Sequence, residues 1–359
     1  MPISWRNTAA HKTLSILLLG YLSTSPAWSV ESTLPSLVEL VRAGIRQHTP
    51  DKMMARELRH MSLKERLPLR YVEELESEGA GPETVAALEY LLEGSAGKPP
   101  SAAIPPFQSP ARPTIDEQRA FFHRVDVNAI HYSKSLPNFI CTEVVHRYQA
   151  PPGKEAAVPW KPKDVLTVKL TYFENREKYE LVLVNGKKSP LTYESTRGAV
   201  SEGDFGSVLV EIFSPDSKTK FQWSHWTRLR GRLTRVYSYR TPKETSHYRI
   251  GVGERPENRW IVTAGRHGFV YADDETASVV RITGEADELP GNYPVKAQAN
   301  MIDYDYGVVG DRKYLLPLRV DTRMNTRQVL FKNVVEFTAY RKFTGESSIS
   351  FDVPEGEQK

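Results

Sequence analysis

Hydrophobic positions along the chain follow two different periods. Between residues 34 and 95, apolar residues recur every three or four positions, as at Leu37, Val41 and Ile45, which is the spacing of one face of a helix. From residue 138 onward the period is two, as in DVLTVKLTYF at residues 164–173, which is typical of strands with one buried face. The pattern predicts a small helical module followed by a strand-rich domain.

A proline-rich segment separates these two parts. Residues 98–113 read KPPSAAIPPFQSPARP and contain six prolines, a composition typical of semi-rigid extended linkers. We assign residues 96–113 to this linker. Thr114 and Glu117 then form a capping-box signature, so we expect a helix to begin there and to end before Pro137.

Short turn signals connect the predicted strands. Asn185-Gly186 follows YELVLV, and this residue pair is favoured in two-residue hairpins. Residues 273–276 and Gly310-Asp311 also lie between alternating segments. Local turns of this kind favour antiparallel sheet.

One helix is expected within the series of hairpins. Ser201 and Asp204 can cap the segment DFGSVLVEIF at residues 204–213, and Pro215 would end it. Such an apolar helix is expected to pack across one face of the sheet. Residues 328–343 are predicted to be the longest strand, and the candidate ligand-lining positions lie on this helix and this strand: Val208, Leu209, Ile212, Val329, Phe331, Val335 and Phe337.

The first 29 residues have the pattern of a secretory signal peptide. Arg6 and Lys12 precede the apolar run SILLLGYL, and Ala27-Trp28-Ser29 matches the small-x-small cleavage pattern. No later run approaches the roughly 20 apolar residues of a membrane helix. We therefore expect a periplasmic or secreted protein without a transmembrane segment in the mature chain.

Charge and cysteine content exclude two classes of protein. Lys and Arg number 48 against 44 Asp and Glu, a formal net charge of +4, so no nucleic-acid partner is predicted. Arg228, Arg230 and Arg232 are interpreted as one solvated strand face. A single cysteine excludes an internal disulfide scaffold.

That cysteine, Cys141, lies five positions before His146, which raises the question of a nucleophile and its base. The surrounding NFICTEVVHRY is rich in β-branched and aromatic residues, which favour a strand. Residues an odd number of positions apart on a strand point to opposite faces. The dyad is therefore rejected, and Cys141 is interpreted as a small buried residue.

No other constellation suggests catalysis or metal binding. The histidines show no metal-ligand spacing, and neither a nucleophile elbow nor a phosphate-binding glycine loop is present. Asp303 and Asp305 share one strand face and are interpreted as solvated acids. We predict no catalytic residue, no metal, no cofactor and no enzymatic activity.

The order of elements and one string near the end resemble a known family. The string is YADDETASVVRITGEADELPGNYPVKAQANMIDYDYGVVGDRKYLLPLRV, and it is similar to the LolA-like superfamily of outer-membrane lipoprotein-sorting proteins, which includes LolB-like and RseB-like relatives. The resemblance covers residues 114–353 and is strongest at residues 273–282 and 310–317. It implies a strongly curved antiparallel sheet, an unclosed barrel packed with helices, so the fold class is α+β preceded by a small all-α module at residues 34–95.

The resemblance implies a function in binding. Some members of the superfamily hold acyl chains on the concave face, so we expect an envelope protein that binds a lipid or a lipoprotein acyl chain. The alternative is a protein-interaction or envelope-sensor module whose apolar face is packed core. In that case the N-terminal helices would engage an envelope protein partner.

Overall fold

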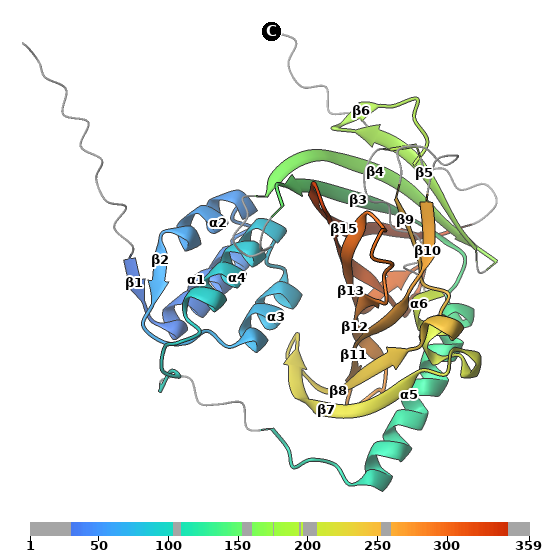
Figure 1. The fold of residues 1–359 in the computed structure, drawn as a ribbon, viewed down its shortest axis with the longest axis horizontal. Helices are drawn as coiled ribbons and strands as arrows, with labels where there is room; N and C mark the ends of the chain where they lie inside the picture. Colours follow the sequence, from blue (N-terminus) through green and yellow to red (C-terminus); the bar gives the residue numbers. More distant parts are fainter. Residues whose placement is uncertain are drawn as a thin grey trace, which may run out of the picture.

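A computed structural model describes residues 30–102, 109–152, 160–174, 176–193, 195–196, 207–252 and 260–343 (Figure 1). The expected signal peptide, residues 1–29, lies outside these ranges. So do residues 103–108 of the linker, the expected start of the inserted helix at residues 201–206, and residues 344–353 of the domain that resembles LolA-like proteins.

The N-terminal module contains four helices and one parallel pair of short strands. The Thr33 side chain caps the first helix, and Gly79 ends the third with a φ of 115°, a left-handed conformation that glycine adopts without steric cost. Leu37, Leu58 and Leu88 are fully buried in the module's own core, as the helical spacing predicts. The elements are β1 Val30–Ser32, α1 Leu34–Arg46, α2 Asp51–Arg59, β2 Met61–Leu63, α3 Leu69–Glu78 and α4 Pro82–Gly94.

An antiparallel sheet of eleven strands forms most of the remaining structure. Its order is β6-β5-β4-β3-β15-β14-β13-β12-β11-β8-β7, so β6 and β7 are edges and the sheet is not closed. The α+β class and the unclosed antiparallel sheet are as predicted. The strands are β3 Phe139–Ala150, β4 Lys161–Phe173, β5 Arg176–Val184, β6 Lys187–Lys188, β7 Lys220–Leu229, β8 Arg232–Thr241, β11 Gly265–Asp273, β12 Val279–Asp287, β13 Val295–Val309, β14 Arg312–Thr326 and β15 Leu330–Lys342.

Tight turns join the neighbouring strands where the sequence predicts them. Asn185 and Gly186 have φ values of 51° and 74°, the positive pair that a type I′ hairpin requires. Arg230 and Gly231 repeat this geometry between β7 and β8, with φ values of 48° and 75°. The prediction that Arg230 lies on an extended strand face is therefore wrong, because Arg230 belongs to the turn.

Two helices, α5 Ile115–Ser135 and α6 Ser207–Phe213, cover one face of the sheet. Thr114 and Glu117 form both hydrogen bonds of the predicted capping box. Asn128 of α5 donates to the carbonyl oxygens of Thr276 and Ala277 at 3.1 and 3.2 Å, which ties the helix to the β11–β12 turn. A small pair, β9 Arg249–Val252 and β10 Trp260–Thr263, flanks the sheet.

One face of the sheet is mainly apolar and the other carries charged residues. Residues directly paired across neighbouring strands share a face, so the strand register assigns each residue to one of the two faces. One row, here the helix face, packs against α5 and α6: Ile282, Ile302, Val320, Val335 and Val145. The next row lies on the opposite face, here the module face: Arg281, Asp303, Arg319 and Glu336. Figure 1 shows the N-terminal module and α5 on opposite sides of the sheet.

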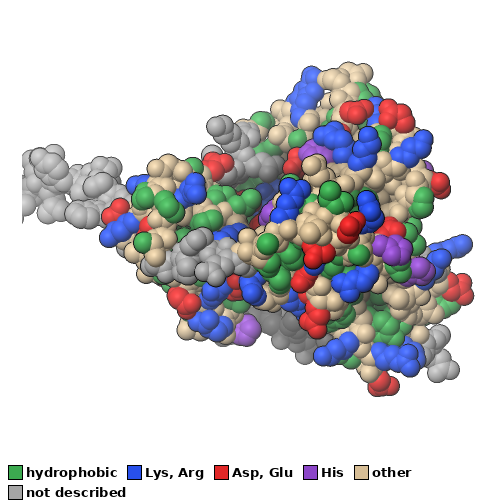
Figure 2. Space-filling view, turned by 90° about the horizontal axis from the view of Figure 1, so that it is seen from below, with side chains coloured by type: hydrophobic (Ala, Val, Ile, Leu, Met, Phe, Trp, Pro, Cys, Tyr) green, Lys and Arg blue, Asp and Glu red, His purple; other side chains and the backbone are tan. Residues whose placement is uncertain are grey.

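None of the described helices combines the length and apolar character needed to span a membrane. On the surface drawn in Figure 2, Lys and Arg side chains are interspersed with Asp, Glu and apolar side chains. Mixed signs of charge over this surface are typical of an ordinary solvated exterior.

Candidate functional site

The predicted ligand-lining residues divide into three groups. Leu209 and Ile212 of α6 are buried with Val335 and Phe337 of β15 in the core of the helix face, and Val208 packs against this core while half-buried. Phe331 instead packs against a smaller cluster around Ile250, Tyr293 and Met324.

Val329 does not belong to the strand on which it was predicted. β15 begins at Leu330, and the Val329 carbonyl oxygen accepts hydrogen bonds from the backbone N–H and the hydroxyl of Thr326 at 3.0 and 2.7 Å. Val329 therefore lies in the β14–β15 turn. The longest strands are β13 and β14, with 15 residues each, and β15 has 13, so the prediction of the longest strand is also wrong.

A cleft of about 430 Å³ opens between α5, α6 and the start of β7. Three aromatic rings form its floor, with centroid separations of 4.7 Å for Phe122–Phe221, 5.0 Å for Phe213–Phe221 and 5.9 Å for Phe122–Phe213. Ile212, one of the predicted lining residues, also lines this cleft.

Charged and polar side chains surround this aromatic floor. Arg119, His123 and Lys218 are exposed, and Asp126 is half-buried. Burial raises the pKa of Asp126, and the charge of His123 opposes that shift. An apolar floor with a few polar groups around it is the usual composition of a small-molecule site. The arrangement can bind an apolar or amphipathic molecule.

Cys141 occupies the position that strand parity predicts. It is fully buried on the helix face, whereas His146 pairs with Val334 on the opposite face. Burial raises the pKa of the Cys141 thiol well above its usual value, which suppresses the reactive thiolate. The interpretation of Cys141 as a structural residue and not half of a dyad is confirmed.

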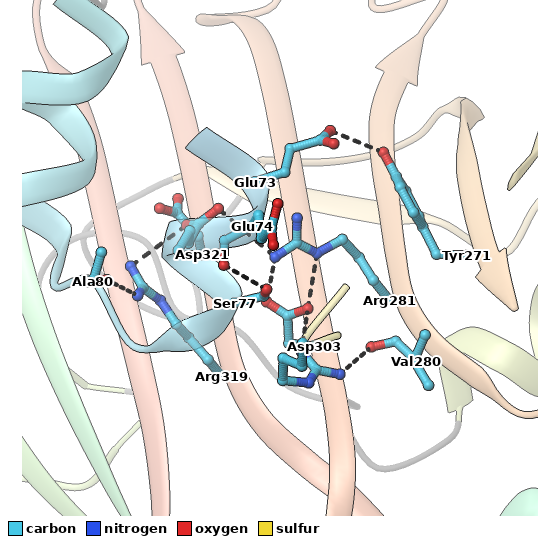
Figure 3. A network of polar contacts seen from close by, with 12 residues as sticks. Glu73, Glu74, Ser77, Ala80, Tyr271, Val280, Arg281, Asp303, Arg319 and Asp321 are labelled. Carbon is cyan, nitrogen blue, oxygen red and sulfur yellow. Dashed lines mark hydrogen bonds and ion pairs between the residues drawn. The ribbon is translucent and has the colours of Figure 1, made fainter. Parts of the chain in front are cut away.

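The module face carries a buried ionic network that the sequence reading missed (Figure 3). The Arg281 guanidinium donates to both carboxylate oxygens of Asp303 at 2.8 Å, and both residues are at most 1% exposed. Arg230 adds a third contact to Asp303 at 3.3 Å. The interpretation of Asp303 as a solvated strand acid is therefore wrong, because the module and the neighbouring strands bury it.

Glu76 of α3 lies between two arginines of the sheet. Its carboxylate oxygens are 3.8 Å from Arg281 Nη2 and 3.6 Å from Arg319 Nη2, while Arg319 Nη1 donates to the Ala80 carbonyl oxygen at 2.7 Å. Burial raises the pKa of Glu76 despite both arginines. Tyr271 donates to Glu73 at 3.1 Å and adds a second contact from α3 (Figure 3).

A second ionic group joins α4 to β14 and β15. Arg323 reaches Glu89 at 3.0 Å and Asp321 at 3.1 Å, and Lys332 lies 3.5 Å from Asp321. Burial opposes ionisation of Asp321, but Arg323 and Lys332 outweigh it and lower the pKa of Asp321. Lys332 is only 1% exposed. The N-terminal module is thus joined to the sheet largely by charged side chains.

The described residues contain no cluster of His, Cys, Asp and Glu with the geometry of a metal site. Asp273 accepts from the backbone N–H groups of Glu275 and Thr276 at 3.1 and 2.8 Å. Its role as a turn residue is therefore confirmed.

No protein-family model and no curated protein matches the chain. Among solved structures, a LolA superfamily protein from Nitrosomonas europaea is similar, with a TM-score of 0.34 and 8% identity over 63% of this chain and 93% of that chain. Its description names the superfamily that the sequence resembles.

Two further structures are similar at the same level. An outer membrane lipoprotein-sorting protein domain from Vibrio parahaemolyticus has a TM-score of 0.29 and 9% identity over 62% of this chain and 93% of that chain. A DUF1329 family protein from Desulfovibrio piger has a TM-score of 0.30 and 10% identity over 64% of this chain and 94% of that chain.

Proposed function

We propose that this protein binds an apolar ligand, a lipid or an acyl chain, on the helix face of its open sheet. The observation that carries the proposal is the cleft between α5, α6 and β7, whose floor is formed by Phe122, Phe213 and Phe221. Stacked aromatic rings at an open surface offer apolar area that a ligand can remove from water. The proposed role is binding without catalysis, because the charged groups surround the floor and the floor itself is apolar.

The proposed location is the cell envelope. It rests on the secretory pattern of residues 1–29. An envelope protein that carries acyl chains needs a site shielded from water on one side and open on the other. The unclosed sheet, with α6 packed on its helix face, fits that requirement.

Titration with an apolar fluorophore such as N-phenyl-1-naphthylamine tests the proposal. Saturable fluorescence that lipid displaces is expected for the wild type. His123→Trp should reduce it at least about tenfold, because His123 is an exposed lining residue of the cleft and an indole there fills the opening. Lys134→Trp is the matched control, since Lys134 is exposed near the far end of the same helix.

A protein-interaction role is the second candidate, and the ionic contact between module and sheet favours it. Interfaces within a chain that are polar resemble transient protein–protein contacts. If the folded wild type binds no apolar probe, the protein-interaction role is favoured over ligand binding. Binding that is equal in wild type and His123→Trp would instead place the ligand away from the cleft.

A further inference from the structure

Arg266 is buried on the helix face, and none of the described acidic residues lies within ion-pair distance of it. It lies on β11 four residues before Val270 of the helix-face core, so the two side chains share a face, and it is 1% exposed. Its Nη2 donates to Asn300 Oδ1 at 2.8 Å, and its guanidinium lies 4.6 Å from the centre of the Tyr248 ring. Its Nε and Nη1 atoms have no hydrogen-bond partner.

The other buried basic residues of the described chain all have an acid within ion-pair distance. Arg147 is 2.5 Å from Asp164, Arg281 is 2.8 Å from Asp303, Arg319 is 3.6 Å from Glu76 and Lys332 is 3.5 Å from Asp321. Arg147 shares the helix face with Val145 of β3, but among these buried residues of the described chain Arg266 alone has no such pair. The difference separates Arg266 from the network that joins the module to the sheet.

A buried arginine without an acidic partner lowers the stability of the folded protein. The guanidinium stays protonated in proteins, and an uncompensated buried charge costs several kcal/mol. The Tyr248 ring and one amide oxygen offset part of that cost. The charge of Glu211 in α6 acts on Arg266, yet the Glu211 carboxylate accepts from the His247 backbone N–H at 3.1 Å and forms no ion pair with Arg266. Two guanidinium nitrogens, Nε and Nη1, are left for an anion.

Arg266 lies one layer of side chains from the cleft. It pairs across the strands with Thr241, whose hydroxyl is 2.7 Å from that of Thr219, a lining residue. Beside it, the ring of Tyr239 is 6.2 Å from that of Phe221, which forms part of the aromatic floor. A ligand in the cleft is therefore separated from the guanidinium only by small or rotatable side chains.

We propose that Arg266 binds the anionic head group, a carboxylate or phosphate, of an amphiphile whose apolar part occupies the cleft. This inference rests on the proposed function and specifies its ligand class. A charged guanidinium nitrogen donates short, strong hydrogen bonds to anion oxygens, and burial strengthens the attraction relative to water. Asn300 holds the guanidinium through its Nη2 atom.

Competition experiments with palmitate and hexadecanol test the head-group preference, because the two share a chain length and differ in charge. The wild type should bind palmitate at least about tenfold more tightly, which corresponds to about 1.4 kcal/mol. Arg266→Met should bind both equally, with hexadecanol affinity unchanged. Equal affinities in the wild type, or a preference retained in Arg266→Met, would overturn the inference. Free acetate and inorganic phosphate should compete weakly, and tight binding of either would show a site for a free anion.

Two further variants test whether the preference for a charged head group comes from Arg266 or from another residue. A Cβ atom at Gly284 would lie 2.3 Å from Arg266 Nε, so Gly284→Ala must displace the guanidinium while its charge remains, and the preference should fall. Lys134→Met removes an exposed charge near the far end of α5, away from the residues that line the cleft, and should leave the preference intact. A preference lost in Lys134→Met as well would show a general effect of charge and overturn the inference.

Stability provides a readout independent of the ligand. Arg266→Met should unfold at the same or a higher urea concentration than the wild type, because it removes an unpaired buried charge. A large loss of stability would show a structural role and contradict the inference. If neither palmitate, hexadecanol nor the fluorophore binds, the proposed function fails and the inference falls with it. If hexadecanol and the fluorophore bind without a charge preference, only the inference fails.

Discussion

Asp303→Asn should lower the free energy of unfolding far more than Glu76→Gln, although both acids contact Arg281. Asp303 receives two hydrogen bonds of 2.8 Å from Arg281 and a contact of 3.3 Å from Arg230. Its loss leaves the buried Arg281 guanidinium with only the more distant Glu76 as an acidic partner, and removing one partner of a buried pair costs about 3–5 kcal/mol. The amide of Asn supplies only one acceptor oxygen, so little of that loss is recovered.

Glu76→Gln should cost about 1 kcal/mol or less. The Glu76 oxygens lie 3.6 and 3.8 Å from the arginine nitrogens, and Oε1 accepts no hydrogen bond. Burial already disfavours the charged form, as the raised pKa of Glu76 indicates. A neutral side chain of the same shape avoids that desolvation cost, which offsets the lost attraction.

The pH dependence of stability follows from the same two groups. The pKa of Asp303 is lowered from 3.8 despite burial, chiefly by Arg281, so its contribution is complete above about pH 3.8 and is lost as the pH falls through its folded pKa. The pKa of Glu76 is raised from 4.5 by burial, so its protonation favours the folded state as the pH falls from its folded pKa towards 4.5. Glu76→Gln should therefore abolish a gain in stability on mild acidification.

Urea unfolding of both variants, followed by tryptophan fluorescence at neutral and mildly acidic pH, measures these differences. Arg240→Gln is a suitable control, because Arg240 is 63% exposed at its side chain although it pairs with Asp287 at 2.8 Å, and an exposed pair contributes at most about 1 kcal/mol. A cost for Glu76→Gln equal to that of Asp303→Asn would refute the distinction drawn from distance and burial.

Two further predictions concern the core cysteine and the linker. Cys141→Ala should leave fluorophore binding intact and lower the free energy of unfolding by about 1 kcal/mol, because a small buried side chain is lost. Abolished binding in the folded variant would contradict this prediction. Rapid reaction of the native thiol with Ellman's reagent would also contradict it. Limited proteolysis should cut between Lys98 and Pro113, and the two fragments should elute together at low salt and separate at high salt, because charged pairs connect the module to the sheet. Resistance to cleavage, or fragments that unfold, would show that the two parts share one core.

Local sequence patterns determined much of the secondary structure. The alternation of period two predicted antiparallel strands, and Asn185-Gly186 predicted a turn that has both positive φ values. Strand parity alone separated Cys141 from His146. These features depend on residues close together in the chain, where backbone geometry and side-chain direction follow directly from the local residue types.

Only the tertiary structure decided which charged residues are buried. Asp303 and Lys332 occupy alternating positions that are usual for solvated strand residues, and their burial depends on helices α3 and α4, which lie more than two hundred positions earlier in the chain. Arg266 gives no sequence signal either, because nothing near it in the chain shows that it is buried without a carboxylate at ion-pair distance among the described residues. Burial and pairing of charges depend on which distant elements pack together, and an alternating pattern specifies the faces of a strand but not what covers each face.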